Sequence, residues 1–128
     1  MDLAELKARA QAARQFTVPI GECVFSLRTP TRLELREALL RHSIDPRDQS
    51  ALQMAVLQSY LLHGFLVGWT GVRDADVVPD AGTAPLPWSP DAVPLLLDAR
   101  PDWGDTLGAA LMDAVHQRAT RIEADAKN

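Results

Sequence analysis

Apolar and polar residues alternate along two short stretches that begin at residue 16. The apolar positions are Phe16, Val18 and Ile20 in the first stretch and Cys23, Phe25 and Leu27 in the second. Between them, Gly21-Glu22 can form a two-residue turn with glycine first, which is typical of a tight hairpin. This turn pairs Ile20 with Cys23, Val18 with Phe25 and Phe16 with Leu27, so that all six side chains share one face. The pattern predicts a β-hairpin over 16–28, whose apolar face must cover helices because a two-stranded ribbon alone is marginally stable.

A narrow apolar stripe precedes the hairpin and predicts a helix over residues 1–15. Asp2 can cap its start, and the stripe consists of Leu3, Leu6, Ala10 and Ala13. Such a helix is marginal in isolation, so we expect it to be mobile unless it packs against a neighbour. The narrow stripe also motivates the hypothesis that the protein forms a homo-oligomer.

A pair of helices is predicted over 30–66. Thr31 followed three residues later by Glu34 is a capping-box pattern for the first helix. Asp45 and Pro46 match the cap and the first position of the second, which we expect to be the central buried helix. No charged side chain occurs from 49 to 72, but six polar residues interrupt this run, which argues against a membrane span.

Breaks and new helix starts organise the second half of the chain. Five residues exclude a long regular element between 68 and 89: Gly71, Pro79, Gly82, Pro85 and Pro87. Ser89 is expected to cap the first of the C-terminal helices over 90–125, and Pro101 separates it from the last. The apolar stripe of the last helix is Leu107, Leu111, Ala114, Val115 and Ile122. The predicted fold is mainly α: one small helical domain over 1–128, with about four to five helices and one N-terminal β-hairpin.

Charge and cysteine content narrow the functional classes. The net charge of −4 and a pI near 5.2 argue against a nucleic-acid binder, which needs a basic stripe. Cys23 is the one cysteine and cannot form an internal disulfide, and no signal-peptide pattern begins the chain. We therefore expect a protein of the reducing cytoplasm.

Candidate chemical groups do not form a recognisable motif. His42, His63 and His116 fall on three different predicted helices, without metal-ligand spacing. Asp74, Asp76 and Asp80 are spaced somewhat like calcium ligands, but the third ligand position and the closing glutamate are missing, being occupied by Val78 and Pro85. We predict no catalytic residue, metal site or cofactor, and hence no enzyme. The disfavoured alternative is a small enzyme with a site in this acidic loop.

The three tryptophans flank breaks between helices. Trp69 and Trp88 bracket the acidic loop, and Trp103 lies at the start of the last helix. Their rings can pin loops on the core, or serve as anchors in a protein–protein surface. The residues proposed to bind a partner are Trp69, Val72, Trp88, Leu3 and Leu6.

Two sequence segments in the second half of the chain resemble tail assembly chaperones of long-tailed phages and prophages. The similarity lies in "VGWTGVRDAD" and in "PLPWSPDAVPLLLDARPDWGDTLGAALMDAV". The matching positions are Gly68, Trp69, Gly71 and Val72, then Pro87, Trp88, Ser89, Asp91 and Ala92, and finally Leu96, Leu97 and Pro101. The resemblance covers residues 65–128 well and the first half only in the order of its elements.

This resemblance implies a non-enzymatic helical protein that acts during tail assembly. Its expected partners are the tape-measure protein and tail-tube subunits, with no nucleic acid and no membrane. It is expected in the cytoplasm of the bacterial host and not in the mature virion. The alternative is a head–tail connector or completion protein, a permanent part of the particle.

Overall fold

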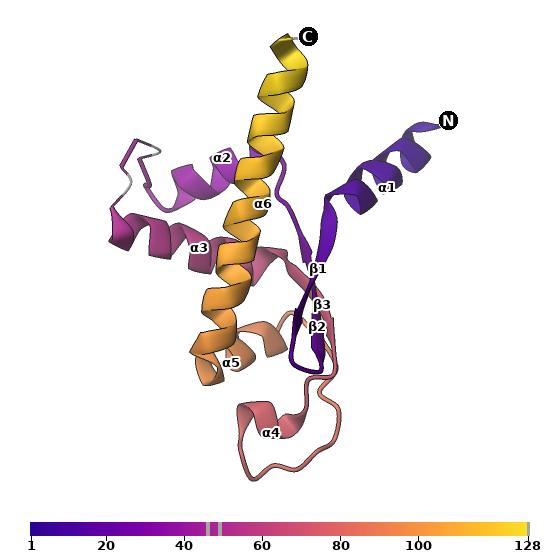
Figure 1. Cartoon of the computed structure of the whole chain (residues 1–128), viewed down its shortest axis with the longest axis vertical. Coiled ribbons are helices and arrows are strands. Elements are labelled where there is room, and N and C mark those ends of the chain that lie inside the picture. Colours follow the sequence, from indigo (N-terminus) through magenta and orange to yellow (C-terminus); the bar gives the residue numbers. More distant parts are fainter. Residues whose placement is uncertain (46, 49, 128) are drawn as a thin grey trace.

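The protein is a helical assembly built around a small antiparallel sheet (Figure 1). The computed structural model describes residues 1–45, 47–48 and 50–127. The helices are α1 (Leu3–Arg14), α2 (Arg32–Arg41), α3 (Ala51–Phe65), α4 (Asp74–Val77), α5 (Ala92–Ala99) and α6 (Pro101–Lys127), and the strands are β1 (Gln15–Ile20), β2 (Cys23–Arg28) and β3 (Leu66–Thr70). The mainly α fold expected from the sequence is confirmed. No helix in the described part of the chain has the length and apolar character that a membrane crossing requires.

The predicted hairpin forms in the predicted register. β1 and β2 pair antiparallel with Ile20 opposite Cys23, Val18 opposite Phe25 and Phe16 opposite Leu27. The β2 members of these pairs are buried, whereas the β1 members are half-buried. The sheet order β1-β2-β3 explains this difference, because β2 is the central strand and β1 lies at the edge.

The third strand corrects the expectation that 68–89 is a loop throughout. β3 follows α3 without a linker and pairs antiparallel with β2, Trp69 lying opposite Phe25. The register shifts between Ser26 and Leu27 of β2, so that Gly68 pairs with Ser26, Leu66 pairs with Leu27, and Val67 has no partner in the register. This irregularity brings Leu66 and Trp69, which are three residues apart, to the same buried face. Strict alternation is therefore absent from the sequence of this strand.

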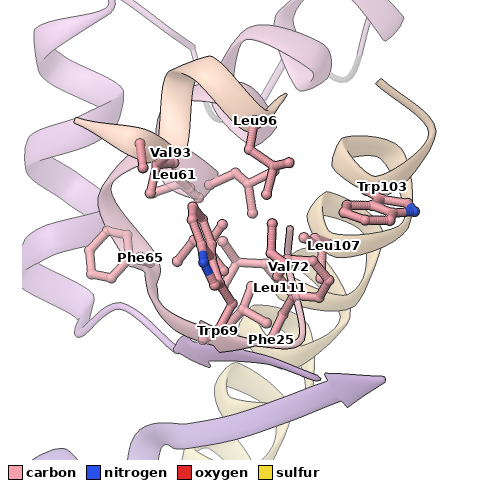
Figure 2. Packing of buried hydrophobic residues seen from close by; sticks show 14 of the residues in the cluster. Phe25, Leu61, Phe65, Trp69, Val72, Val93, Leu96, Trp103, Leu107 and Leu111 are labelled. Carbon is pink, nitrogen blue, oxygen red and sulfur yellow. The ribbon is translucent and has the colours of Figure 1, made fainter. Parts of the chain in front are cut away.

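The core lies between the sheet and the helices α3, α5 and α6. Phe25 sits near its centre, with its ring 6.3 Å from that of Trp69 and 5.5 Å from that of Trp103, edge to face in both cases. Leucines of the helices fill the space around these rings (Figure 2). The predicted stripe of the last helix is buried at Leu107 and Leu111, so this part of α6 closes the core.

The two predicted helix starts of the first half have different outcomes. At α2, Thr31 and Glu34 form the expected capping box, in which each side chain accepts a hydrogen bond from the other residue's backbone N–H. The predicted cap Asp45 is wrong, because its Oδ1 accepts from the N–H of Arg47 in a local turn and Ser50 caps α3 instead. Pro46 lies outside the described residues.

Both ends of the chain project from the body of the molecule. In Figure 1, α1 and the last turns of α6 extend to the same side, and no residue of α1 is buried. Asp2 caps α1 as expected, its Oδ1 accepting a hydrogen bond from the N–H of Glu5. The direction of α1 is set at its end, where β1 follows directly and the N–H of Thr29 donates to the carbonyl oxygen of Arg14. The projecting helix is thus a direct continuation of the sheet.

Candidate functional site

The acidic loop, which lies between Trp69 and Trp88, has its two ends joined by backbone hydrogen bonds. The N–H of Leu86 donates to the carbonyl oxygen of Val72, and the N–H of Asp74 donates to that of Ala84, so the two ends of the loop run side by side. Inside it, the Arg73 side chain donates to the carbonyl oxygen of Thr83. The short helix α4 fills the first part of the loop. These bonds explain how a segment rich in glycine and proline keeps one conformation.

Asp76 connects the acidic loop to the start of α6. One oxygen of its carboxylate lies 3.7 Å from Arg100, whose guanidinium also donates two hydrogen bonds to Asp102 and lies over the ring of Trp103. Hydrogen bonding to Asp102 raises the pKa of Arg100 above its usual value. Asp76 therefore stabilises a structural junction in this arrangement.

The histidines and the cysteine do not assemble into a reactive centre in the described ranges. His42 packs against the ring of Tyr60, and Nδ1 of His63 lies 2.7 Å from the carbonyl oxygen of Ser59. The thiol of Cys23 is buried and donates to the carbonyl oxygen of Gly71, and burial raises its pKa, which disfavours the reactive thiolate. Residues 1–45, 47–48 and 50–127 contain no group of three or more His, Cys, Asp or Glu side chains placed to hold a metal ion.

The residues predicted to bind a partner fall into two groups. Trp69 and Val72 are in the core, exposed to 8% and 1%, which leaves them little surface for a partner. The indole N–H of Trp69 donates to the carbonyl oxygen of Leu86, and that of the half-buried Trp88 donates to the carbonyl oxygen of Leu66. Both rings therefore pin the acidic loop against the sheet. Leu3 and Leu6 are exposed on α1 and remain available.

A groove lies between α2 and the last turns of α6. It encloses about 990 Å³. Apolar side chains of both helices and the segment after α2 line it: Leu33, Leu35, Leu39, Leu40, Ile44, Val115, Ala119, Ile122 and Ala126. Two of these leucines lie at its edge and are exposed, Leu33 to 65% and Leu40 to 74%, so the groove presents adjoining apolar surface. The apolar stripe of α6 thus changes role along the helix, from the core at Leu111 to the groove at Ile122.

Arg118 lines the groove together with Arg32 and Arg36. Arg14 and Arg28 are not among the lining residues, but the charges of Arg28 and Arg118 act on Arg14. Partial burial and the positive charges of Arg28 and Arg118 lower the pKa of Arg14. Within the part of the chain that the structure describes, Nε of Arg118 is buried without a hydrogen-bond partner. We call Arg14, Arg28 and Arg118 the arginine cluster.

Glu34 is the carboxylate that balances part of this cluster. Its two oxygens accept hydrogen bonds from Arg28 at 3.0 and 3.2 Å. Burial by itself would raise the pKa of Glu34, but the hydrogen bonds from Arg28 and from the backbone of Thr31 outweigh it and lower the pKa. One carboxylate among three arginines leaves the cluster with an excess of positive charge in a protein whose net charge is −4.

The groove was not identified in the sequence, although some of its signals were visible. Leu33, Leu39 and Leu40 are apolar residues of the first helix predicted over 30–66, and Ile122 belongs to the predicted stripe of the last helix. These stretches lie about 80 residues apart, and nothing local indicates that they face each other. No protein-family model matches the chain, and neither a curated protein nor a solved structure matches it significantly.

Proposed function

We propose that this protein is a tail assembly chaperone of a long-tailed phage or prophage. In this proposal it is non-enzymatic, acts in the host cytoplasm, and binds the tape-measure protein before the tail tube encloses it. Tail-tube subunits are a second expected partner, and the chaperone is absent from the finished particle. The resemblance of residues 65–128 to this family is the sequence argument for the proposal.

The structural observation that carries the proposal is the groove between α2 and α6. Its walls are two helices, its lining is mainly apolar, and leucines at its edge are exposed. An amphipathic helix can lay its apolar face into such a groove. A long tape-measure protein presents apolar helical stripes until it is enclosed, and covering them keeps it from associating with itself.

The test is co-expression with the large helical protein encoded downstream of this chain. We expect the partner to co-purify and its soluble fraction to rise when this protein is present. Leu40→Asp should abolish both effects, because it places a charge at the apolar edge of the groove. Leu52→Asp is the matched control, since Leu52 is 76% exposed on α3 and does not line the groove.

Two results would argue against the proposal. The absence of binding and of rescued solubility for the unaltered protein would remove the chaperone function. Recovery of the protein from purified particles would favour the head–tail connector instead.

A further inference from the structure

From the projecting helix and the apolar groove, we infer that the groove of each molecule receives helix α1 of a second copy, in a reciprocal two-fold dimer. The inference concerns the free protein and extends the proposed function. In that context α1 covers the groove until a partner helix displaces it.

Helix α1 is held away from the body of its own molecule. It joins β1 without a linker, and the hydrogen bond from Thr29 to Arg14 extends the strand pairing to its last residue. Folding α1 back onto its own groove would break this junction. A 12-residue helix without a buried residue is also marginal when nothing packs against it. A second molecule supplies the packing that its own chain cannot.

Helix α1 and the groove both present apolar side chains. α1 presents Leu3 and Leu6, both exposed, on a stripe that continues through two alanines. The groove offers leucines of α2 and, on α6, the small Ala119 beside Ile122. Small residues on both helices allow a close approach, while the leucines bury apolar area on each side.

Acidic and basic residues follow one another in opposite order along α1 and along the groove wall of α6. On α1, acidic Asp2 and Glu5 are followed by basic Lys7 and Arg9. On the α6 wall, basic Arg118 is followed five residues later by acidic Glu123, about 7.5 Å further along the helix, where Glu123 also lies 3.7 Å from Lys127 in an exposed ion pair. Glu5 and Arg9 are about 6 Å apart along α1. Opposite charges therefore face each other when α1 runs parallel to α6 of the second molecule.

The overall arrangement of the molecule fits this orientation. The free end of α1 is the end that carries the acids, and Arg118 lies nearer the body than the C-terminal turns of α6. Because α1 and the last turns of α6 project to the same side (Figure 1), two molecules can meet with these ends overlapping. The tip of each α1 then reaches the arginine cluster of the other, where it supplies the missing carboxylates. The two-fold axis provides the contact twice.

The test is the molecular mass of the purified protein in solution, measured by light scattering over a range of micromolar concentrations. We expect about 28 kDa, twice the 14.0 kDa of one chain. Leu6→Asp in the helix and Leu40→Asp at the groove should each give the monomer mass. Burial of the leucine is then lost in both contacts, which weakens dimerisation about 100-fold or more. Both residues are exposed in the single chain, at 56% and 74%, so folding should persist, and Leu52→Asp should remain dimeric.

A wild-type protein that stays at 14.0 kDa would overturn the inference and leave the groove to a different protein. Dimers that persist in either variant would overturn it as well. None of these results depends on the tape-measure protein.

Discussion

Gly108 of α6 lies so close to the Gln58 side chain of α3 that substitution at this position gives a specific prediction. A Cβ atom at this position would lie 2.5 Å from Nε2, 2.7 Å from Cγ and 2.9 Å from Cδ of Gln58 on α3. Cγ lies near the root of the side chain, so rotation of the amide group alone cannot clear the overlap. At Gly104, one turn earlier on α6, a Cβ would meet only Cδ2 of Leu97 at 3.7 Å, which is ordinary contact. Gly104→Ala is therefore the matched control for Gly108→Ala.

The two substitutions share one energetic term and differ in the other. Replacing glycine by alanine inside a helix favours the helix by up to about 1 kcal/mol. Gly104→Ala should therefore raise the free energy of unfolding by about 0.5–1 kcal/mol. Gly108→Ala carries the same gain but also overpacks the interface of α3 and α6, at a cost of about 1–3 kcal/mol. We expect the Gly108 variant to be less stable than the Gly104 variant by about 1–3 kcal/mol.

Urea unfolding followed by tryptophan fluorescence measures both values, because the protein has three tryptophans. A Gln58→Ala background supplies the internal check: without the long side chain, Gly108→Ala should become as favourable as Gly104→Ala. Equal stability of the two glycine variants in the wild-type background would refute the close approach of the helices at this point. An overlap cost that persists in the Gln58→Ala background would show that another group causes it.

Three further predictions follow from the core, the α2 cap and the loop. Trp69→Ala should lower the free energy of unfolding by about 3–5 kcal/mol in urea, because the ring is buried and its hydrogen bond is lost; a loss below about 1 kcal/mol with weakened partner binding would instead place this residue at an interface. Glu34→Gln should lower Tm at neutral pH, because the carboxylate pairs with Arg28 and its pKa in the folded protein is lowered. The stability that Glu34 contributes is present above its ordinary pKa and is lost as the pH falls through the lowered pKa. The difference in Tm from wild type should therefore shrink as the pH falls below about 4.5. A difference independent of pH would contradict this. Gly71→Ala should lower Tm more than Gly82→Ala. Both glycines have positive φ, at 82° and 99°, but only at Gly71 would a Cβ meet the backbone of the hairpin turn, where it would lie 2.6 Å from the carbonyl oxygen of Glu22. Equal effects on Tm would rule out that contact.

Local patterns predicted the elements that depend on neighbours in the chain. Alternation around Gly21-Glu22 was sufficient for the hairpin and its register, because a two-residue turn and one apolar face leave a single pairing. The capping box of Thr31 and Glu34 likewise depends on residues three positions apart. The start of α3 was misplaced because Asp, Pro and Ser all occur before it, and the sequence alone does not show which oxygen accepts the first free N–H of the helix.

Contacts between distant segments decided the rest. β3 was missed because its irregular register removes the alternation by which a strand is recognised, and only pairing with β2 shows that Leu66 and Trp69 share a face. Trp69 and Val72 were candidates for a partner surface, yet both side chains are buried in the core while Thr70 and Gly71 between them are exposed. For Leu3 and Leu6, exposure agrees with the expectation, and partner binding stays a prediction.

The sequence by itself determined that this chain forms helices around a hairpin, because amphipathic periodicity, helix caps and tight turns depend on residues that are close together in the chain. It also determined that a narrow, weakly apolar helix begins the chain. Only the tertiary structure decided where apolar surface remains uncovered. The groove combines α2 with the end of α6, and the arginine cluster combines residues of α1, β2 and α6. Such surfaces arise from segments that are far apart in the chain, so their apolar and charged groups become neighbours only when the core between them is packed.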